Sequence, residues 1–240
     1  MSARNYFIKI RELIDKVEET QYNKILEAAD ILAQKIEEDQ LLHIFGTGHS
    51  HMIAEEMFVR AGGLAPVNAL LDENVILTAG ARKSSKLEKL DGLAEIIWEE
   101  HRIDEDDLML IVSNSGRNSA PVEMALKAKE EGLFLMAITS LDHSKESESR
   151  HKSGKKLYEI ADLVLDNCVP HGDSLLEFNG VQSGPGSTIG GVSIVNSIVA
   201  ETLKILSEKG VILPVYGSQN VDGVNNDMLF DKYEDRIKYL

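Results

Sequence analysis

The sequence predicts an α/β fold built on a parallel sheet with helices on both faces. Residues 108–112 form a run of apolar residues that is too short for a helix and contains branched side chains that favour extended backbone. A run that is apolar on both faces suits a parallel strand covered by helices on each side. Short runs of this kind alternate along the chain with stretches of helical spacing, which is typical of parallel strands joined by right-handed crossovers.

The 240 residues are expected to form a single domain, with N-terminal helices over 1–38, a sheet core over about 39–210 and a C-terminal extension over 211–240. Residues 6–38 carry apolar side chains three and four apart, which predicts one or two amphipathic helices. The predicted strands are 41–45, 65–71, 108–112, 133–138 and 163–165. The later predicted helices are 53–61, 87–101, 121–131, 187–206 and 232–239, and the predicted long loops are 72–85 and 177–187.

The charge balance limits the partners of this chain. Its 40 acidic and 25 basic residues give a net charge of −15, which repels nucleic acid and anionic lipid. The opening Met-Ser-Ala-Arg lacks the apolar core of a signal peptide, and no uninterrupted apolar run reaches the length of a membrane span. The single cysteine, Cys168, cannot form an internal disulfide. We therefore expect a cytoplasmic protein that binds neither nucleic acid nor membranes.

A loop rich in hydroxyl and amide groups follows the strand 108–112. It reads Ser113-Asn114-Ser115-Gly116-Arg117-Asn118-Ser119 and leads into the helix predicted from Pro121. The start of a helix presents unpaired N–H groups and a partial positive charge, and the side chains of this loop add further donors. A phosphate group is the natural occupant. The alternative is a simple helix cap at Asn118 or Ser119, but a cap needs one residue and this loop offers six polar side chains.

The strand 41–45 runs into a similar turn, Gly46-Thr47-Gly48-His49-Ser50-His51. A dinucleotide-binding fingerprint would need a third glycine where His51 stands, and an acidic residue about 20 residues further on. Asp72 lies somewhat too far along the chain for that role. We expect no nicotinamide or flavin, no other cofactor and no metal.

These motifs together resemble the sugar isomerase (SIS) domain. The resemblance rests on residues 46–50, 113–118 and the Thr139-Ser140 strand exit, and it covers about residues 30–210. It implies a three-layer α/β/α sandwich with a five-stranded parallel sheet, usually dimeric or tetrameric, that binds phosphosugars. The phosphate- and sugar-binding residues expected on this basis, with two polar neighbours included, are Ser50, His51, Ser113, Asn114, Ser115, Asn118 and Ser119.

Within the family, the Gly-x-Gly-x-Ser-His start and the N-terminal helices are similar to phosphoheptose isomerase. That enzyme carries a metal-binding His and a Glu on the helix after the first loop, where this chain has Glu56 and Arg60. Over its whole length the chain is similar to uncharacterised bacterial SIS-domain proteins, including His171-Gly172-Asp173 and residues 218–226.

Sugar isomerisation moves a proton between adjacent carbons and needs a base at the carbon and a donor at the oxygens. A carboxylate in a partly desolvated cleft can serve as that base, and Glu55, Glu56 and Glu177 are candidates. His171 and Asp173 could act as base and orienting acid, or as two metal ligands. The alternative for each is an ordinary surface or loop side chain.

We therefore expect a phosphosugar isomerase of the aldose–ketose type that works as a homodimer or homotetramer, with catalytic candidates Glu55, Glu56 and His171. The alternatives are a non-catalytic phosphosugar sensor or regulatory protein, and an etherase-type lyase that acts on a phosphosugar.

Overall fold

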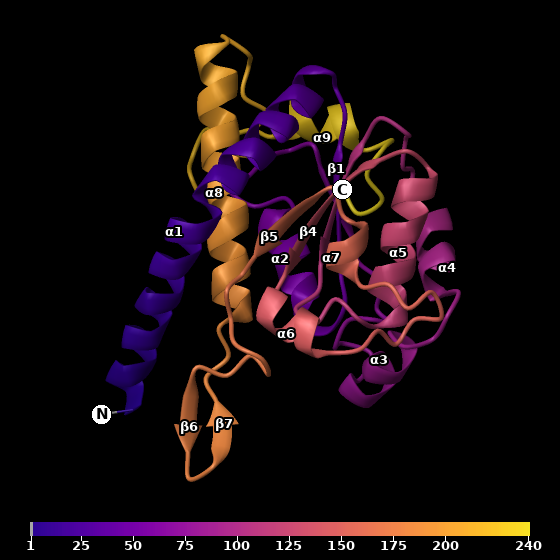
Figure 1. Ribbon diagram of the computed structural model, residues 1–240. Coiled ribbons are helices and arrows are strands. Elements are labelled where there is room, and N and C mark those ends of the chain that lie inside the picture. The colour runs from indigo at the N-terminus through magenta and orange to yellow at the C-terminus, as the bar shows by residue number, and fades with distance from the viewer. Residues whose placement is uncertain (1) are drawn as a thin grey trace.

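The computed structural model describes residues 2–240 and has a five-stranded parallel sheet at its centre, in the order β2-β1-β3-β4-β5 (Figure 1). The strands are β1 (Leu42–Gly46), β2 (Val67–Leu70), β3 (Leu108–Val112), β4 (Phe134–Thr139) and β5 (Leu163–Asp166). In the register, Leu108 of β3 pairs with Leu42 on one side and with Phe134 on the other. This confirms the α/β fold with a five-stranded parallel sheet, which the strand that is apolar on both faces and the family resemblance predict.

Helices cover both faces of the sheet because alternate strand residues point to opposite sides. Ile44 and Leu110 belong to the core shared with α1 (Ser2–Glu37), α2 (His51–Met57) and α8 (Ser187–Glu208). Phe45 and Ile111 face the core shared with α4 (Leu93–Glu99), α5 (Ser119–Glu130) and α7 (Leu157–Ile160). The result is the predicted three-layer arrangement.

Short elements complete the edges. A 3-10 helix (Gly48–Ser50), α3 (Ala81–Leu87) and α6 (Leu141–Glu146) follow strand ends or loops. The C-terminal extension contains α9 (Asp227–Tyr233), and a separate small core joins its Tyr233 and Ile237 to Leu41. This core lies where β1 begins, so this part of the extension covers the amino end of the sheet, while the hydroxyl of Tyr239 donates to the carbonyl of Leu71 just after β2.

Several predicted boundaries are wrong. The predicted helix 87–101 begins only at Leu93, after a turn at Gly92 (φ +89°), and α3 lies mostly within the predicted loop 72–85. The expectation of one or two helices over 6–38 is met by one, α1, which ends at Glu37. The final helix is 227–233 rather than 232–239. Residues 177–187, predicted as a loop, contain most of an antiparallel hairpin of β6 (Leu176–Phe178) and β7 (Val181–Ser183), which projects from the body beside the start of α1 (Figure 1).

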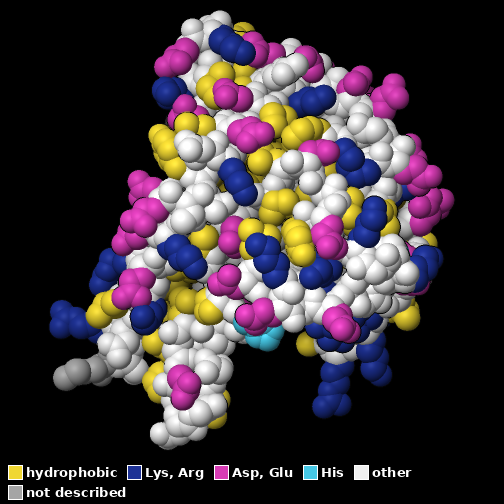
Figure 2. Space-filling model, viewed as in Figure 1, with side chains coloured by type: hydrophobic (Ala, Val, Ile, Leu, Met, Phe, Trp, Pro, Cys, Tyr) yellow, Lys and Arg dark blue, Asp and Glu magenta, His cyan; other side chains and the backbone are white. Residues whose placement is uncertain are grey.

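Within residues 2–240, α8 alone is long and apolar enough to span a membrane by length and composition. It packs against α1 and α2, and its buried side chains, such as Ile194, Val195 and Ile198, belong to the main core. α8 therefore has the place of a core helix in this fold. On the face shown in Figure 2, acidic and basic side chains are interspersed, so the negative charge is not gathered into one patch there.

Candidate functional site

A small cleft opens at the carboxyl edge of the sheet, where ligands of α/β proteins usually bind. Its lining comes from the turn after β1, the ends of β3 and β5, and the first turn of α8. The lining residues are His49, Ser50, Ile53, Val112, Asn114, Asn167, Ser187 and Thr188. Two of the predicted binding residues, Ser50 and Asn114, therefore share one cleft although 64 positions separate them in the sequence.

The loop between β3 and α5 is fixed at its base by hydrogen bonds to neighbouring strand ends. The side-chain oxygen of Asn114 accepts from the amide of Asn167 at 3.0 Å, and the carbonyl of Asn114 accepts from the N–H of Ser140 at 3.0 Å. Within the loop, the Ser113 hydroxyl accepts from the N–H of Gly116 at 3.2 Å. The ends of β3, β4 and β5 are thus held together as one polar platform.

Three backbone N–H groups of this loop are free to donate to a ligand. In the described part of the chain, the N–H groups of Ser115, Arg117 and Asn118 have no protein acceptor. They precede the N-terminus of α5, whose dipole adds a partial positive charge. Ser115 is half-buried, and it does not itself line the cleft. Free N–H groups beside a helix start are suited to binding an oxyanion.

Asn118 and Ser119 begin α5. Asn118 occupies the cap position, but its side chain makes no cap hydrogen bond, and its oxygen instead accepts from Arg150 at 2.9 Å. The N–H of Arg150 also donates to the carbonyl of Arg117 at 2.8 Å. Ser119 is fully buried, and its hydroxyl has no partner among residues 2–240. Ser119, which we expected to bind the ligand, does not line the cleft.

Of the side chains of α2, Ile53 lines the cleft, and the polar and charged ones lie beside it. His51 is buried, its Nδ1 contacts the carbonyl of Gly48, and its Nε2 lies 3.6 Å from Glu55. The Glu55 side chain is 52% exposed. The carboxylate of Glu56 is held by Arg60 at 2.6 Å and by the amide of Asn196 at 2.9 Å, so its oxygens are already bonded.

His171 pairs with a histidine rather than with the nearby acid. Its ring centroid lies 4.4 Å from that of His143, whose Nδ1 accepts from the N–H of Gly172 at 3.3 Å. Burial, followed by the charges of His171 and Arg117, lowers the pKa of His143. Asp173 instead accepts from the N–H groups of Gly186 and Ser187, at 2.9 and 2.8 Å, and so caps α8. The idea that Asp173 orients His171 is therefore wrong.

The remaining candidates are structural or remote. Glu177 lies on the exposed hairpin and accepts from Gln182 at 3.0 Å. Cys168 is buried near the Thr20 hydroxyl, and burial raises the pKa of its thiol. Apart from the apolar Ile53 and Val112 and the turn residue His49, the cleft is also lined by Asn167, Ser187 and Thr188, to which sequence reasoning assigned no binding role. Asn167 follows the predicted strand 163–165, so the rule that pointed to Asn114 applied to it as well.

The family assignment follows from this fold and site together with the comparisons. The model of the SIS domain matches residues 5–140, and the chain belongs to the SIS domain family. A UPF0309 protein of Halalkalibacterium halodurans is 40% identical over 240 residues, covering 98% of this chain and 96% of the relative. The predicted resemblance to the family and to bacterial proteins of this group is confirmed.

Solved structures show the same fold at low identity. A phosphoheptose isomerase from Francisella tularensis superposes with a TM-score of 0.55 at 17% identity, covering 84% of this chain and 96% of that one. The Vibrio vulnificus NanR protein, solved in complex with ManNAc-6P, has a TM-score of 0.56 at 13% identity, covering 88% of this chain and 65% of that one. At these identities the likeness shows the fold alone.

Proposed function

We propose that this protein binds a phosphorylated sugar, with the phosphate in the loop 113–118 and the sugar in the adjoining cleft. The observation that carries the proposal is the set of N–H groups at Ser115, Arg117 and Asn118, which have no acceptor in the described part of the chain and stand beside a polar cleft. Because the chain has a net charge of −15, an anion needs local donors of this kind. The hydroxyls of Ser50, Ser113 and Ser115 would add further hydrogen bonds.

We further propose that the bound sugar is isomerised by proton transfer between adjacent carbons. The lowered pKa of His143, caused first by burial, favours a neutral imidazole, which can accept a proton. Its neighbour His171 is exposed at the same edge of the sheet and is the best placed of the predicted catalytic residues. Glu55 is the second candidate because its carboxylate, unlike that of Glu56, has no strong partner.

A specific observation also favours a non-catalytic sensor. Neither Glu55 nor Glu56 lines the cleft, and Asp173 is bonded to the start of α8. A protein built in this way could bind a phosphosugar and change its contacts with a partner without turning the sugar over. An etherase-type lyase would use the same phosphate loop and differ in its leaving group.

One experiment separates these functions. Hexose, heptose, amino-sugar and muramic acid phosphates are screened by thermal shift, because a ligand of the native state raises the unfolding temperature with concentration. Each stabilising compound is then followed by NMR for exchange of the C2 proton with solvent. Exchange and a new sugar support the isomerase, loss of an ether substituent supports the lyase, and stabilisation without chemistry supports the sensor.

We also propose that the full chain acts as one cytoplasmic unit that assembles as a homodimer or homotetramer. An apolar groove between α1 and α8, lined in part by Ile14, Val17 and Tyr22, supports the proposed assembly, since Tyr22 is 55% exposed in the single chain. Light scattering on the purified protein tests the oligomeric state, and a monomeric mass at micromolar concentration would contradict the proposed assembly.

A further inference from the structure

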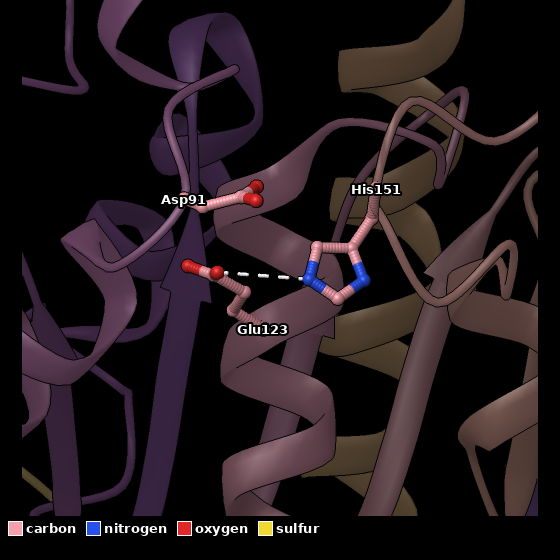
Figure 3. A group of neighbouring side chains, drawn as sticks. All are labelled: Asp91, Glu123 and His151. Carbon is pink, nitrogen blue, oxygen red and sulfur yellow. Dashed lines mark ion pairs between the residues drawn. The ribbon is translucent and has the colours of Figure 1, made fainter.

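We propose that Asp91, Glu123 and His151 form a binding site for a divalent transition-metal ion of the zinc type. The three side chains come from separate segments: the turn before α4, the helix α5 and the loop between α6 and α7 (Figure 3). One ligand atom from each lies within 4.8 Å of the others. None of the three residues lines the cleft described above.

The imidazole of His151 points to a ligand because one of its nitrogens is buried and unpaired. The side chain is 3% exposed, and its Nε2 has no hydrogen-bond partner anywhere in residues 2–240. Nε2 faces Glu123 at 3.6 Å, a separation too long for a hydrogen bond (Figure 3). Buried polar nitrogens are almost always satisfied, so this nitrogen requires a partner between itself and the carboxylates.

The surroundings of His151 allow the tautomer that a metal requires. The opposite nitrogen, Nδ1, lies 2.8 Å from the Ser153 hydroxyl, which can accept a hydrogen bond from it. With the proton on Nδ1, the lone pair of Nε2 is directed at Glu123, and a cation between the two groups satisfies both. The N–H of Ser153 donates to Nδ1 at the longer distance of 3.3 Å in the other tautomer, in which Nε2 carries the proton, so metal binding at Nε2 would move the proton to Nδ1.

The distances and donor types fit zinc. Ligand atoms about 2.0–2.1 Å from a tetrahedral ion lie about 3.3 Å apart. The pair His151–Glu123, at 3.6 Å, is already close to this spacing, and Asp91 is exposed and free to move inward. The N–H of Gly92 holds the Glu123 carboxylate at 2.8 Å and so orients it. An imidazole ligand selects transition metals over Mg²⁺ and Ca²⁺.

A metal here would also stiffen the phosphate loop, an extension that rests on the proposed function. Arg150, which precedes His151, binds the side chain of Asn118 at 2.9 Å and the carbonyl of Arg117 at 2.8 Å. Lys152, which follows it, lies 4.0 Å from Asp91, and its side chain is 72% exposed, so it can move into solvent when a metal binds. Zinc would thus fix the segment that supports the loop.

The test uses the full chain, stripped with a chelator and titrated with Zn²⁺ by calorimetry and equilibrium dialysis. We expect one ion per chain, with affinity lowered about tenfold or more in Asp91→Asn and His151→Gln. Glu95→Gln, which changes an exposed carboxylate on the neighbouring helix α4, is the matched control and should bind as the wild type does. Circular dichroism checks folding, and Asp91→Asn, at an exposed position, decides the result if His151→Gln does not fold.

Absence of Zn²⁺ binding by the wild type would overturn the proposal, as would equal affinity in Asp91→Asn. Saturation with Mg²⁺ but not Zn²⁺ would overturn the assignment of a zinc-type ion. Because zinc binding is measured without sugar, a protein that binds zinc but no phosphosugar would refute the proposed function and leave the metal site standing.

Discussion

Replacing Gly116 by alanine should lower both the stability of the fold and the proposed binding of phosphate by the loop 113–118. Gly116 has φ +58°, a left-handed conformation that costs an L-residue about 1–2 kcal/mol. An added Cβ would lie 3.2 Å from Leu157 Cβ and the Ser144 hydroxyl, and 3.3 Å from the Thr139 hydroxyl. These contacts are tight on three sides of a buried position, and overpacking typically costs about 1–3 kcal/mol.

The two costs together predict a loss of about 2–5 kcal/mol in the free energy of unfolding. For a chain of this size that loss lowers the unfolding temperature by roughly 4–20 °C, which calorimetry can measure. The affinity for any phosphosugar that stabilises the wild type should also fall, because the free N–H groups of Ser115 and Arg117 flank Gly116.

Gly132→Ala is the matched control for this substitution. Gly132 follows α5 at its other end, has φ +88°, and an added Cβ there would meet nothing within 4 Å. It should therefore show the conformational cost of about 1–2 kcal/mol alone, with unchanged sugar affinity. Equal destabilisation by Gly116→Ala and Gly132→Ala would refute the packing argument, and unchanged sugar affinity in Gly116→Ala would refute the role of the loop.

Three further predictions concern groups outside the loop. Burial, helped by the charge of Lys238, lowers the pKa of His101 from 6.5 to about 4, so the unfolded chain binds the proton more readily. The free energy of unfolding should therefore be about 1–2 kcal/mol lower near pH 4 than above pH 6.5, after allowance for the partial exposure of the ring. Urea unfolding of His101→Gln should not show this part of the pH dependence. Asp107 is buried, which raises its pKa, but hydrogen bonds from His43 and the backbone hold the pKa below the ordinary value. Asp107→Asn should therefore lower the free energy of unfolding by about 3 kcal/mol in denaturant. A loss under about 1 kcal/mol would contradict this prediction. The raised pKa of Cys168 should make it react slowly with a disulfide reagent in the native protein and rapidly in denaturant, and equal rates would show that the thiol is accessible.

The parts of the fold that local pattern determines were predictable. The strand 108–112 is apolar on both faces because both of its faces are covered, and the loop after it begins where the structure ends β3. The hairpin 176–183 was missed although its turn is Asn179-Gly180, with φ of +52° and +81°, a dipeptide that favours a two-residue hairpin turn. The many glycines of that stretch instead led to the prediction of a loop.

The candidate site was predicted less completely, for a physical reason. Residues that follow strand ends, such as Ser50 and Asn114, share the carboxyl edge because parallel strands all end there. Spacing in the sequence could not show that Asp173 caps α8, because that contact depends on how a long loop returns to the sheet. The cluster of Asp91, Glu123 and His151 is likewise assembled from three separate segments and has no motif of its own.

The most direct test of the account is the affinity of wild type and Ser115→Ala for a stabilising phosphosugar and for the same sugar without its phosphate. Loss of one hydrogen bond to a charged group should weaken phosphosugar binding by about tenfold or more, whereas Ser207→Ala, at an exposed position on α8, should leave it unchanged. The unphosphorylated sugar should not bind measurably to any of the three proteins. Unchanged affinity in Ser115→Ala, or equal binding of the sugar with and without its phosphate, would contradict the claim that the loop 113–118 binds the phosphate.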